Sequence, residues 1–528
     1  MARSAAHPEP GADGMQRFAR NSAFGTITGL LVALGSVAAN ILVAHLLGVE
    51  RTGVVALALW VAMVAAALAD LGVQASLARY LPELAAAGRA GEAQQLAGVL
   101  LLWLVCSCVA ALAAFAAYAL WAESRGSAPG DAVLYLLIGL ACALQGLAGF
   151  TYGILRGLQR FDRLALVTGI AVACQLAGVA IGSSEFGTAG ALAGYCAGSL
   201  VPALLAFRYA RPGRRAAPDL RVRVRRYALY AWAAALSSTF VWSRAEIFFL
   251  ERSSGSAAVG LFTVGITLAN IATQGSVLLT AGLLPYFAES FGRDALPEMK
   301  NGYATATRVL AFLVLPVSFG MAAILPTALP LVYGRAFAAA VPAATVLVLA
   351  GGVAAVSSVG TSVVMAMDRS DFILASGFVA AVLAVVAGFT VIPAFGLMGA
   401  AWARAGIQVS AVALGNWFVF ARLGFRLPVV GLLKLTVAAA LCGLAARGVL
   451  ALEGGPAALV PAIAAGALTY GAAVKLLRAL HPEDVVRLGA ICGRLPRRWR
   501  AAAEAGLRLL AGSAAIAPVP ARGASDAD

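Results

Sequence analysis

Charged residues are scarce in this 528-residue chain: Asp, Glu, Lys and Arg together make up only 12% of it. A soluble globular domain carries about twice that share. Hydrophobic residues make up 61% and the mean hydropathy is +0.89, so too few polar side chains remain to cover a water-exposed surface. This composition excludes an ordinary soluble enzyme, a disordered chain and a secreted disulfide scaffold. It predicts a polytopic membrane protein.

Metal-binding and redox motifs are also missing. The chain has three histidines and seven cysteines, and none of the cysteines forms a CxxC pair. A zinc site needs clustered Cys or His ligands, so we expect no metal. The GxxxxGK[ST] loop of a built-in ATPase is absent as well. The first apolar run starts near Phe24 and is too long for the h-region of a cleavable signal peptide, so we expect it to stay as a first span.

Long apolar runs are abundant. A helix needs about 20 apolar residues to cross the hydrocarbon core, and we predict fourteen such spans. They are 24–47, 53–73, 96–121, 132–155, 164–183, 188–209, 227–250, 257–285, 303–332, 338–366, 372–393, 396–420, 429–450 and 456–477. The run 303–332 is too long for one straight span, and its prolines (Pro316, Pro326 and Pro330) are placed to kink it or end it early. The fold class is therefore an all-α polytopic membrane protein with about 14 transmembrane helices.

Loop charge predicts the orientation of these spans. The chain has 39 Lys and Arg against 24 Asp and Glu, a net charge of +15. Arginines concentrate in alternate loops, above all in 208–226 and in the C-terminal tail. The opposite loops are short and carry few. By the positive-inside rule, both termini should be cytoplasmic. Because the basic residues lie in loops between spans, no nucleic-acid partner is expected.

Two halves of the chain resemble each other at an offset of 206 to 209 residues. The matching segments, in chain order, are 48–53 with 255–260, 79–83 with 285–289, 160–162 with 369–371 and 186–191 with 395–400. Each half holds six predicted spans, so both halves should enter the membrane in the same orientation. Parallel repeats of this kind are related by an axis along the membrane normal. We therefore predict two parallel six-helix bundles around a central cleft, plus two C-terminal helices.

The predicted organisation has six parts. They are a cytoplasmic N-terminal tail (1–23), a first six-helix bundle (24–210), a basic cytoplasmic linker (211–226), a second six-helix bundle (227–420), two additional helices (429–477) and a cytoplasmic tail (478–528). Val485 and Leu488 share a helical face in this tail, which predicts an amphipathic interfacial helix. From Ser513 onward, small residues and prolines predict disorder.

Three groups of short motifs stand in a fixed order along the chain. They are Leu47-Gly48 with Gly53, Ala69–Gly72 and Arg79-Tyr80; then Gly157–Phe161; then Trp242–Phe249, leading into Val259–Phe262. With six, six and two spans, this order resembles the polysaccharide-unit flippases of the multidrug/oligosaccharidyl-lipid/polysaccharide exporter superfamily, over residues 20–480.

That resemblance implies a transporter and not an enzyme. Its cargo would be a polyprenyl-diphosphate-linked oligosaccharide, such as an O-antigen, exopolysaccharide or capsule repeat unit. The cargo would move from the cytoplasmic to the outer leaflet of a bacterial inner membrane by alternating access. The implied partners are the lipid-linked oligosaccharide, the bilayer, and polysaccharide polymerase and assembly proteins.

Ionisable side chains inside spans cost about 2.5–3.5 kcal/mol on insertion scales, so each is a functional candidate. Arg244 and Glu246 fall in the predicted span 227–250, about 200° apart around a helix, so each would need its own partner. Arg404 lies near the middle of its span, at the place that Tyr195 holds in the first half. We expect both arginines to face the cleft and bind the diphosphate or the sugar. The alternative is structural pairing, such as Arg404 with Glu246.

Other polar residues within spans are candidates as well. Five amides could hydrogen-bond glycan hydroxyls or simply bridge helices: Asn40, Gln145, Gln175, Asn270 and Gln274. Asp70, near the cytoplasmic end of its span, could bind a coupling proton or sodium ion, or else cap and anchor the interface. Arg308 is expected to snorkel. Beyond such an ion gradient, no cofactor is expected.

Three other functions fit part of this pattern. A lipid II flippase shares the architecture. A multidrug or cation antiporter of the same superfamily should have an acidic site, whereas the deep charges Arg244, Glu246 and Arg404 sum to a positive value. A membrane-embedded glycan polymerase or glycosyltransferase should show long external loops or acidic catalytic motifs, and the outer loops here are short.

Overall fold

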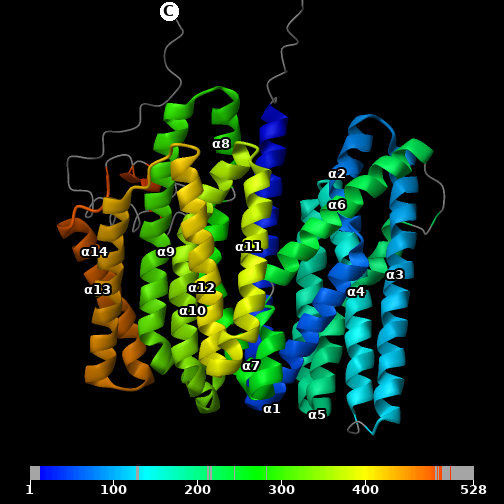
Figure 1. The fold of residues 1–528 in the computed structure, drawn as a ribbon, viewed down its shortest axis with the longest axis horizontal. Coiled ribbons are helices and arrows are strands. Elements are labelled where there is room, and N and C mark those ends of the chain that lie inside the picture. Colours follow the sequence, from blue (N-terminus) through cyan, green and yellow to red (C-terminus); the bar gives the residue numbers. More distant parts are fainter. Residues whose placement is uncertain are drawn as a thin grey trace, which may run out of the picture. The chain divides into compact units, whose positions relative to one another are not determined.

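The computed structural model describes residues 12–126, 130–210, 213, 217–242, 244–280, 282–481, 484–485, 487–489 and 500. All regular elements in this part of the chain are helices, and eleven of them are long and apolar enough to cross a membrane (Figure 1). The prediction of an all-α polytopic membrane protein is confirmed. The chain divides into two compact units: unit 1 comprises Met1–Thr267 and Gly377–Ala403, and unit 2 comprises Leu268–Ser376 and Arg404–Asp528.

Unit 1 is built from the first half of the chain. Its helices are α1 (Ala12–Asp70), α2 (Val73–Ala86), α3 (Ala90–Ser124), α4 (Asp131–Gly157), α5 (Phe161–Tyr209), α6 (Pro218–Trp242) and most of α7 (Glu246–Thr280). Parts of α11 (Ser370–Phe389) and α12 (Val391–Ala421) complete it. Figure 1 shows α3 and α4 running side by side.

Unit 2 contains α8 (Leu283–Gly292), α9 (Leu296–Tyr333), α10 (Val341–Ala366), α13 (Val429–Glu453) and α14 (Leu459–Leu476). Short 3-10 helices, η1 (Arg335–Ala340) and η2 (Pro456–Ala458), precede α10 and α14. The two additional helices pack on α9, where the hydroxyl of Tyr470 donates a hydrogen bond of 2.8 Å to the Phe312 carbonyl. The division into two six-helix bundles around a cleft stays a prediction.

Two helices are too long to be single spans. With 59 residues, a straight α1 would measure about 90 Å, about three times the thickness of the hydrocarbon core. Instead, α1 turns at Gly48 (φ 76°, ψ −177°) and α5 turns at Gly187 (φ 60°, ψ −132°), conformations that favour glycine. Figure 1 shows the two arms of α1 diverging from this turn. Each of these helices therefore supplies two of the predicted spans.

The second half of the chain repeats these turns. Gly255 has φ 78° and ψ 176°, and Gly396 has φ 54° and ψ −128°, close to the values in the first half. A left-handed φ also recurs at Gln159 (54°) and Asp368 (55°). The offsets between equivalent turns match those found in the sequence, so the internal repeat is confirmed in the backbone.

The first pair of equivalent turns packs backbone against backbone. A Cβ atom on Gly53 would lie 1.7 Å from the carbonyl oxygen of Ser256, and one on Gly260 would lie 2.1 Å from that of Val49. Val49 and Gly53 of the first turn correspond to Ser256 and Gly260 of the second, so each turn presents the same two positions to the other. The contact therefore has local pseudo-twofold symmetry. Only glycine allows so close an approach of the two backbones.

The other two turns lie beside this contact. The side chain of Ser254 is next to Gly396, and that of Arg51 is next to Gly187. All four turns therefore gather at one end of unit 1, which we call the glycine-turn end. It is the end predicted to face away from the cytoplasm.

One prediction about an individual span was wrong, and for another span one of its two alternatives is excluded. The predicted span 227–250 is broken, since α6 ends at Trp242 and α7 begins at Glu246. In the predicted span 303–332, the prolines do not end the helix early, because α9 continues past Pro330 to Tyr333. Part of the predicted linker is helical as well, because α6 begins at Pro218.

The start of the C-terminal tail packs on unit 2. Val485 and Leu488 contact Val309 of α9, which agrees with the predicted amphipathic face. Arg308 does not simply snorkel: it forms an ion pair of 2.8 Å with Asp484, whose side chain is fully buried. A carboxylate within reach makes pairing more favourable than extension towards water. The predicted disorder from Ser513 lies outside the described residues.

Candidate functional site

Arg244 lies in the break between α6 and α7. Its φ of 69° is left-handed, a conformation that costs a non-glycine residue about 1–2 kcal/mol. Its carbonyl accepts a hydrogen bond of 3.0 Å from the N–H of Ile247, in the first turn of α7. The expectation that Arg244 and Glu246 lie 200° apart on one helix is therefore wrong. Their directions are set by a turn.

Glu246 is the first residue of α7 and is only 3% exposed. A carboxylate at this position is favoured by the positive end of the helix dipole. The helix start thus gives this buried acid a structural role, whatever else it does.

Two predicted site residues, Arg244 and Asn40, lie at a similar depth in unit 1 to Tyr195. Arg244 precedes the turn at Gly255 by eleven residues, or about 16 Å along a helix. Asn40 and Tyr195 each lie eight residues from the glycine of their own turn, or about 12 Å. The hydrocarbon core is about 30 Å thick, so these side chains lie near half depth when measured from the glycine-turn end.

The structure places Arg244 near Tyr195 in unit 1. The guanidinium lies close enough to the phenol hydroxyl for the two groups to interact electrostatically. Sequence analysis aligned Tyr195 with Arg404 across the repeat but missed its proximity to Arg244. The sequence did contain one signal for Tyr195 as a site residue, because a polar aromatic side chain stands there in the middle of an apolar span.

Some buried polar atoms of unit 1 lack a hydrogen-bond partner among the described residues. They include Oδ1 of Asn40 and Nε1 of Trp60. The Trp60 ring lies 6.3 Å from the ring of Phe248 on α7, close to the Arg244 turn. Buried polar groups normally find partners, so these atoms favour the presence of water or a polar ligand nearby. Trp60 was not among the predicted residues.

In unit 2, Arg404 is half-buried on α12 and follows Gly396 by the same eight residues that separate Tyr195 from its turn. Gln408, one helical turn further, has a buried Oε1 without a partner among the described residues. Asn270 is exposed and Gln274 half-buried on the unit 2 part of α7. That Arg404 faces a cleft, or that it pairs with Glu246, stays a prediction.

Asp70 caps a helix. Its Oδ1 accepts a hydrogen bond of 3.3 Å from the backbone N–H of Gln74, in the first turn of α2. The adjacent Ala69 carbonyl accepts one of 2.6 Å from Ser107 of α3. This geometry explains the carboxylate as a cap and leaves its role in ion coupling untested.

The remaining amides are available for new bonds. In the part of the chain that the structure describes, no residue hydrogen-bonds to the side chains of Gln145, Asn270 or Gln274. The same part of the chain contains no cluster of three or more His, Cys, Asp and Glu residues that could hold a metal ion.

Comparison with known sequences matches residues 18–291, just over half of the chain, to a family of polysaccharide biosynthesis proteins. The teichuronic acid biosynthesis protein TuaB of Bacillus subtilis (strain 168) is 24% identical over 177 residues. That match covers 33% of this chain and 36% of TuaB, so the chain spans little more than a third of this relative's length.

Comparison with solved structures identifies the fold. The lipid II flippase MurJ, in an inward closed conformation, gives a TM-score of 0.67 at 11% identity, covering 86% of this chain and 98% of that one. An inward-facing multidrug resistance MATE transporter of the MOP superfamily gives 0.59 at 16% identity, covering 74% and 94%. At these identities the likeness concerns the fold alone.

Proposed function

Because this multi-pass membrane protein belongs to the family of polysaccharide biosynthesis proteins and has the fold of MOP superfamily transporters, we propose that it is a flippase for a polyprenyl-diphosphate-linked oligosaccharide. The family match is the observation that carries the proposal. The cargo would cross from the cytoplasmic to the outer leaflet of a bacterial inner membrane by alternating access. Polysaccharide polymerase and assembly proteins would receive it there.

The physical task is to move charge and hydroxyls through hydrocarbon. A diphosphate and a glycan cannot shed their water without partners, because unpaired polar groups cost several kcal/mol each. In this proposal, Arg244 and Arg404 bind the diphosphate, since a guanidinium offers paired donors to phosphate oxygens. Asn40, Gln145, Asn270 and Gln274 supply hydrogen bonds to the sugars, while the polyprenyl chain stays in lipid.

Ion coupling is a further part of the proposal, and Asp70 is its candidate residue. A partly buried carboxylate beside the Gln74 amide can exchange a proton or a sodium ion with water. Asn caps a helix about as well as Asp, so Asp70→Asn should remove the charge and keep the fold. We expect this variant to lose stimulation by a pH or sodium gradient while retaining basal flipping. Unchanged stimulation would leave Asp70 with its capping role alone.

A leaflet assay tests the proposed function. The purified protein is reconstituted in liposomes with a fluorescent polyprenyl-diphosphate oligosaccharide, and protection of the probe from an external quencher is followed. Each lost charge-assisted hydrogen bond should cost about 1.5–3 kcal/mol, so we expect Arg244→Ala and Arg404→Ala to slow flipping by about tenfold or more. Arg335→Ala, at an exposed arginine, is the matched control.

The outcomes of the leaflet assay test the proposed function and the proposed site residues separately. Loss of flipping in both arginine variants, with Arg335→Ala active, supports a cationic pathway. Full flipping in both would keep the flippase and remove these two residues from it. If no lipid-linked glycan moves but a soluble organic cation is exported, the protein is a drug antiporter. Flipping of lipid II in preference to other glycan carriers would identify a lipid II flippase, and polymerised product would identify an enzyme.

A further inference from the structure

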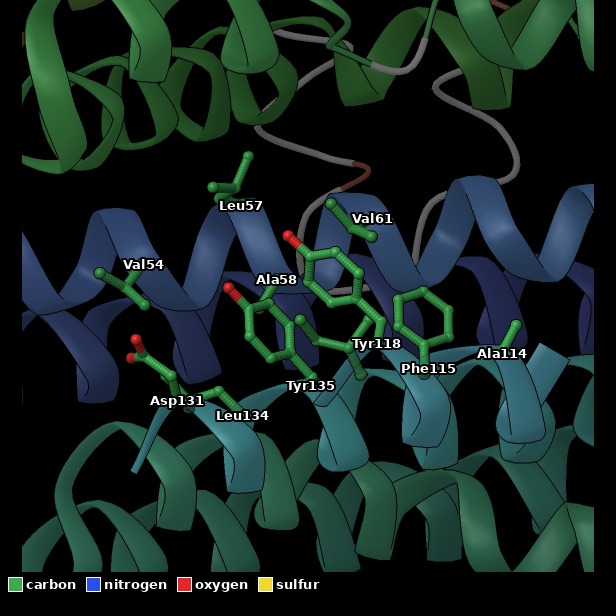
Figure 2. A pocket seen from close by; sticks show the side chains of 11 residues that line it. Val54, Leu57, Ala58, Val61, Ala114, Phe115, Tyr118, Asp131, Leu134 and Tyr135 are labelled. Carbon is green, nitrogen blue, oxygen red and sulfur yellow. The ribbon is translucent and has the colours of Figure 1, made fainter. Parts of the chain in front are cut away.

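Unit 1 contains a groove that the proposed transport does not use. Its volume is about 540 Å³, within the range of roughly 300–1,000 Å³ typical of small-molecule sites. The second arm of α1 contributes Leu57 and Val61, α3 contributes Phe115, and α4 contributes Leu134 and Ile138. Figure 2 shows these helices surrounding the groove. Such walls offer no hydrogen bonds to a glycan and suit a hydrocarbon chain.

One end of the groove is polar. The rings of Tyr118 and Tyr135 meet edge to face at 4.8 Å, and in Figure 2 both hydroxyls point towards α1. Asp131, one turn before Tyr135 on α4, lines the same end and is half-buried. Trp121 lies 5.6 Å from Tyr118, and the guanidinium of Arg125 lies 5.2 Å from the Trp121 ring. The polar end is therefore lined by two phenol rings and a carboxylate, and the exposed side chains of Trp121 and Arg125 flank it without lining it.

The position of the groove matches the boundary of a bilayer. Its polar end lies where α3 ends, at Ser124, and where α4 begins, at Asp131. From there it follows α4 as far as Ile138, a distance of about 10 Å into the apolar region. Tyr and Trp are typical of membrane interfaces, so the polar end is at headgroup level and the apolar part is at chain level.

We propose that this groove binds a membrane phospholipid with a primary-amine headgroup. One hydrocarbon chain fills the apolar part, the ammonium group is held by Asp131, and the phosphate lies towards Arg125. Charge disfavours an anionic occupant, and hydrogen bonding selects a primary amine, because the quaternary ammonium of phosphatidylcholine has no N–H to donate to the Asp131 carboxylate. A diphosphate-linked glycan would bring two or more negative charges to the Asp131 carboxylate, whereas a zwitterionic aminophospholipid presents a cation to it and an anion to the guanidinium. The site is therefore a lipid site distinct from the cargo path, and it does not depend on the proposed function.

Lipid binding to the full-length protein tests this inference. The delipidated protein in detergent is titrated with phosphatidylethanolamine, phosphatidylcholine or phosphatidylglycerol of identical chains, and bound lipid is counted by native mass spectrometry. We expect phosphatidylethanolamine to bind most tightly. Asp131→Asn should weaken its binding by about tenfold, the effect of one charge-assisted hydrogen bond. Glu123→Gln, at an exposed carboxylate at the same end of α3, should leave it unchanged.

A second variant tests the apolar part of the groove independently of its polar end. Ala114 lines the groove and is exposed, so Ala114→Phe should fill the apolar part without disturbing the fold, as the thermal midpoint would verify. It should lower the affinity for all three lipids. Equal affinities for the three lipids, or an ethanolamine preference that survives Asp131→Asn, would overturn the proposal. Tighter binding of a polyprenyl diphosphate that Ala114→Phe abolishes would assign the groove to the cargo.

Discussion

Single residues matter most where two backbones touch. At Gly53 and Gly260 the space for a side chain is occupied by the carbonyl of the opposite turn. At Gly48 there is open space, and the positive φ alone requires glycine. Close contact between backbones requires glycine at the first two positions, and backbone conformation requires it at the third. The sequence alone does not distinguish these two requirements.

Replacing Gly53 by alanine tests the contact. Its Cβ atom would lie 1.7 Å from the Ser256 carbonyl oxygen, so the two turns would have to separate. Overpacking of this kind costs about 1–3 kcal/mol or more, and we expect a clearly lower midpoint of thermal unfolding in detergent. Gly29→Ala, on the first arm of α1 with nothing within 4 Å, is the control and should not lower it. Equal midpoints for both variants would contradict the close packing.

Among the elements, the C-terminal tail is held by one buried ion pair. Asp484 accepts from both Nε and Nη2 of Arg308, at 2.8 Å each, and from the backbone N–H of His481 at 2.9 Å. The side chains of Arg308 and Asp484 are 15% and 0% exposed. Breaking such a pair leaves a buried charge uncompensated, whereas an exposed pair contributes little.

We therefore expect Asp484→Ala to destabilise the protein by about 3 kcal/mol or more, lowering its unfolding midpoint and exposing the tail to protease after Arg487. The exposed pair of Arg369 and Asp371 offers the comparison, and Asp371→Ala should leave the unfolding midpoint almost unchanged. The double variant Arg308→Met with Asp484→Leu should recover much of the loss. If Asp484→Ala were as stable as Asp371→Ala, the ion pair of Arg308 and Asp484 would not be what holds the tail.

At the scale of the whole molecule, the open question is which side of the membrane each loop faces. Loop arginines predict that the connection between α2 and α3 is cytoplasmic and that the one between α3 and α4 is external. With 35 residues, α3 measures about 52 Å, which is long enough to place both of its ends outside the hydrocarbon core.

Cysteines placed at the two ends of α3 test this orientation. Gly91 has nothing within 4 Å and Ser124 is exposed, so both positions tolerate the change. A membrane-impermeant maleimide should label Ser124→Cys in intact cells, and Gly91→Cys only after permeabilisation. The unaltered chain, with its native cysteines, is the background control. The reverse labelling pattern would invert the predicted topology.

Much of the fold was predictable because its causes are local along the chain. Apolar run length predicts a span wherever it occurs, and the two copies of Gly48–Gly53 and Gly255–Gly260 revealed the repeat before its turns were seen. The break at Arg244 was not predictable in this way. Residues 227–250 are apolar enough for a span, and the left-handed turn that interrupts them does not follow from hydropathy.

The sequence alone was sufficient to establish a polytopic helical membrane protein, its internal repeat and the scarcity of charge that makes each deep arginine a candidate. These properties follow from the free energy of transferring each segment into hydrocarbon, which sums over neighbouring residues. Tertiary packing was needed to bring Tyr195 to Arg244, Asp484 to Arg308, and the walls of the lipid groove together from α1, α3 and α4. Those contacts join residues far apart in the chain, so they depend on how helices pack and not on any one segment.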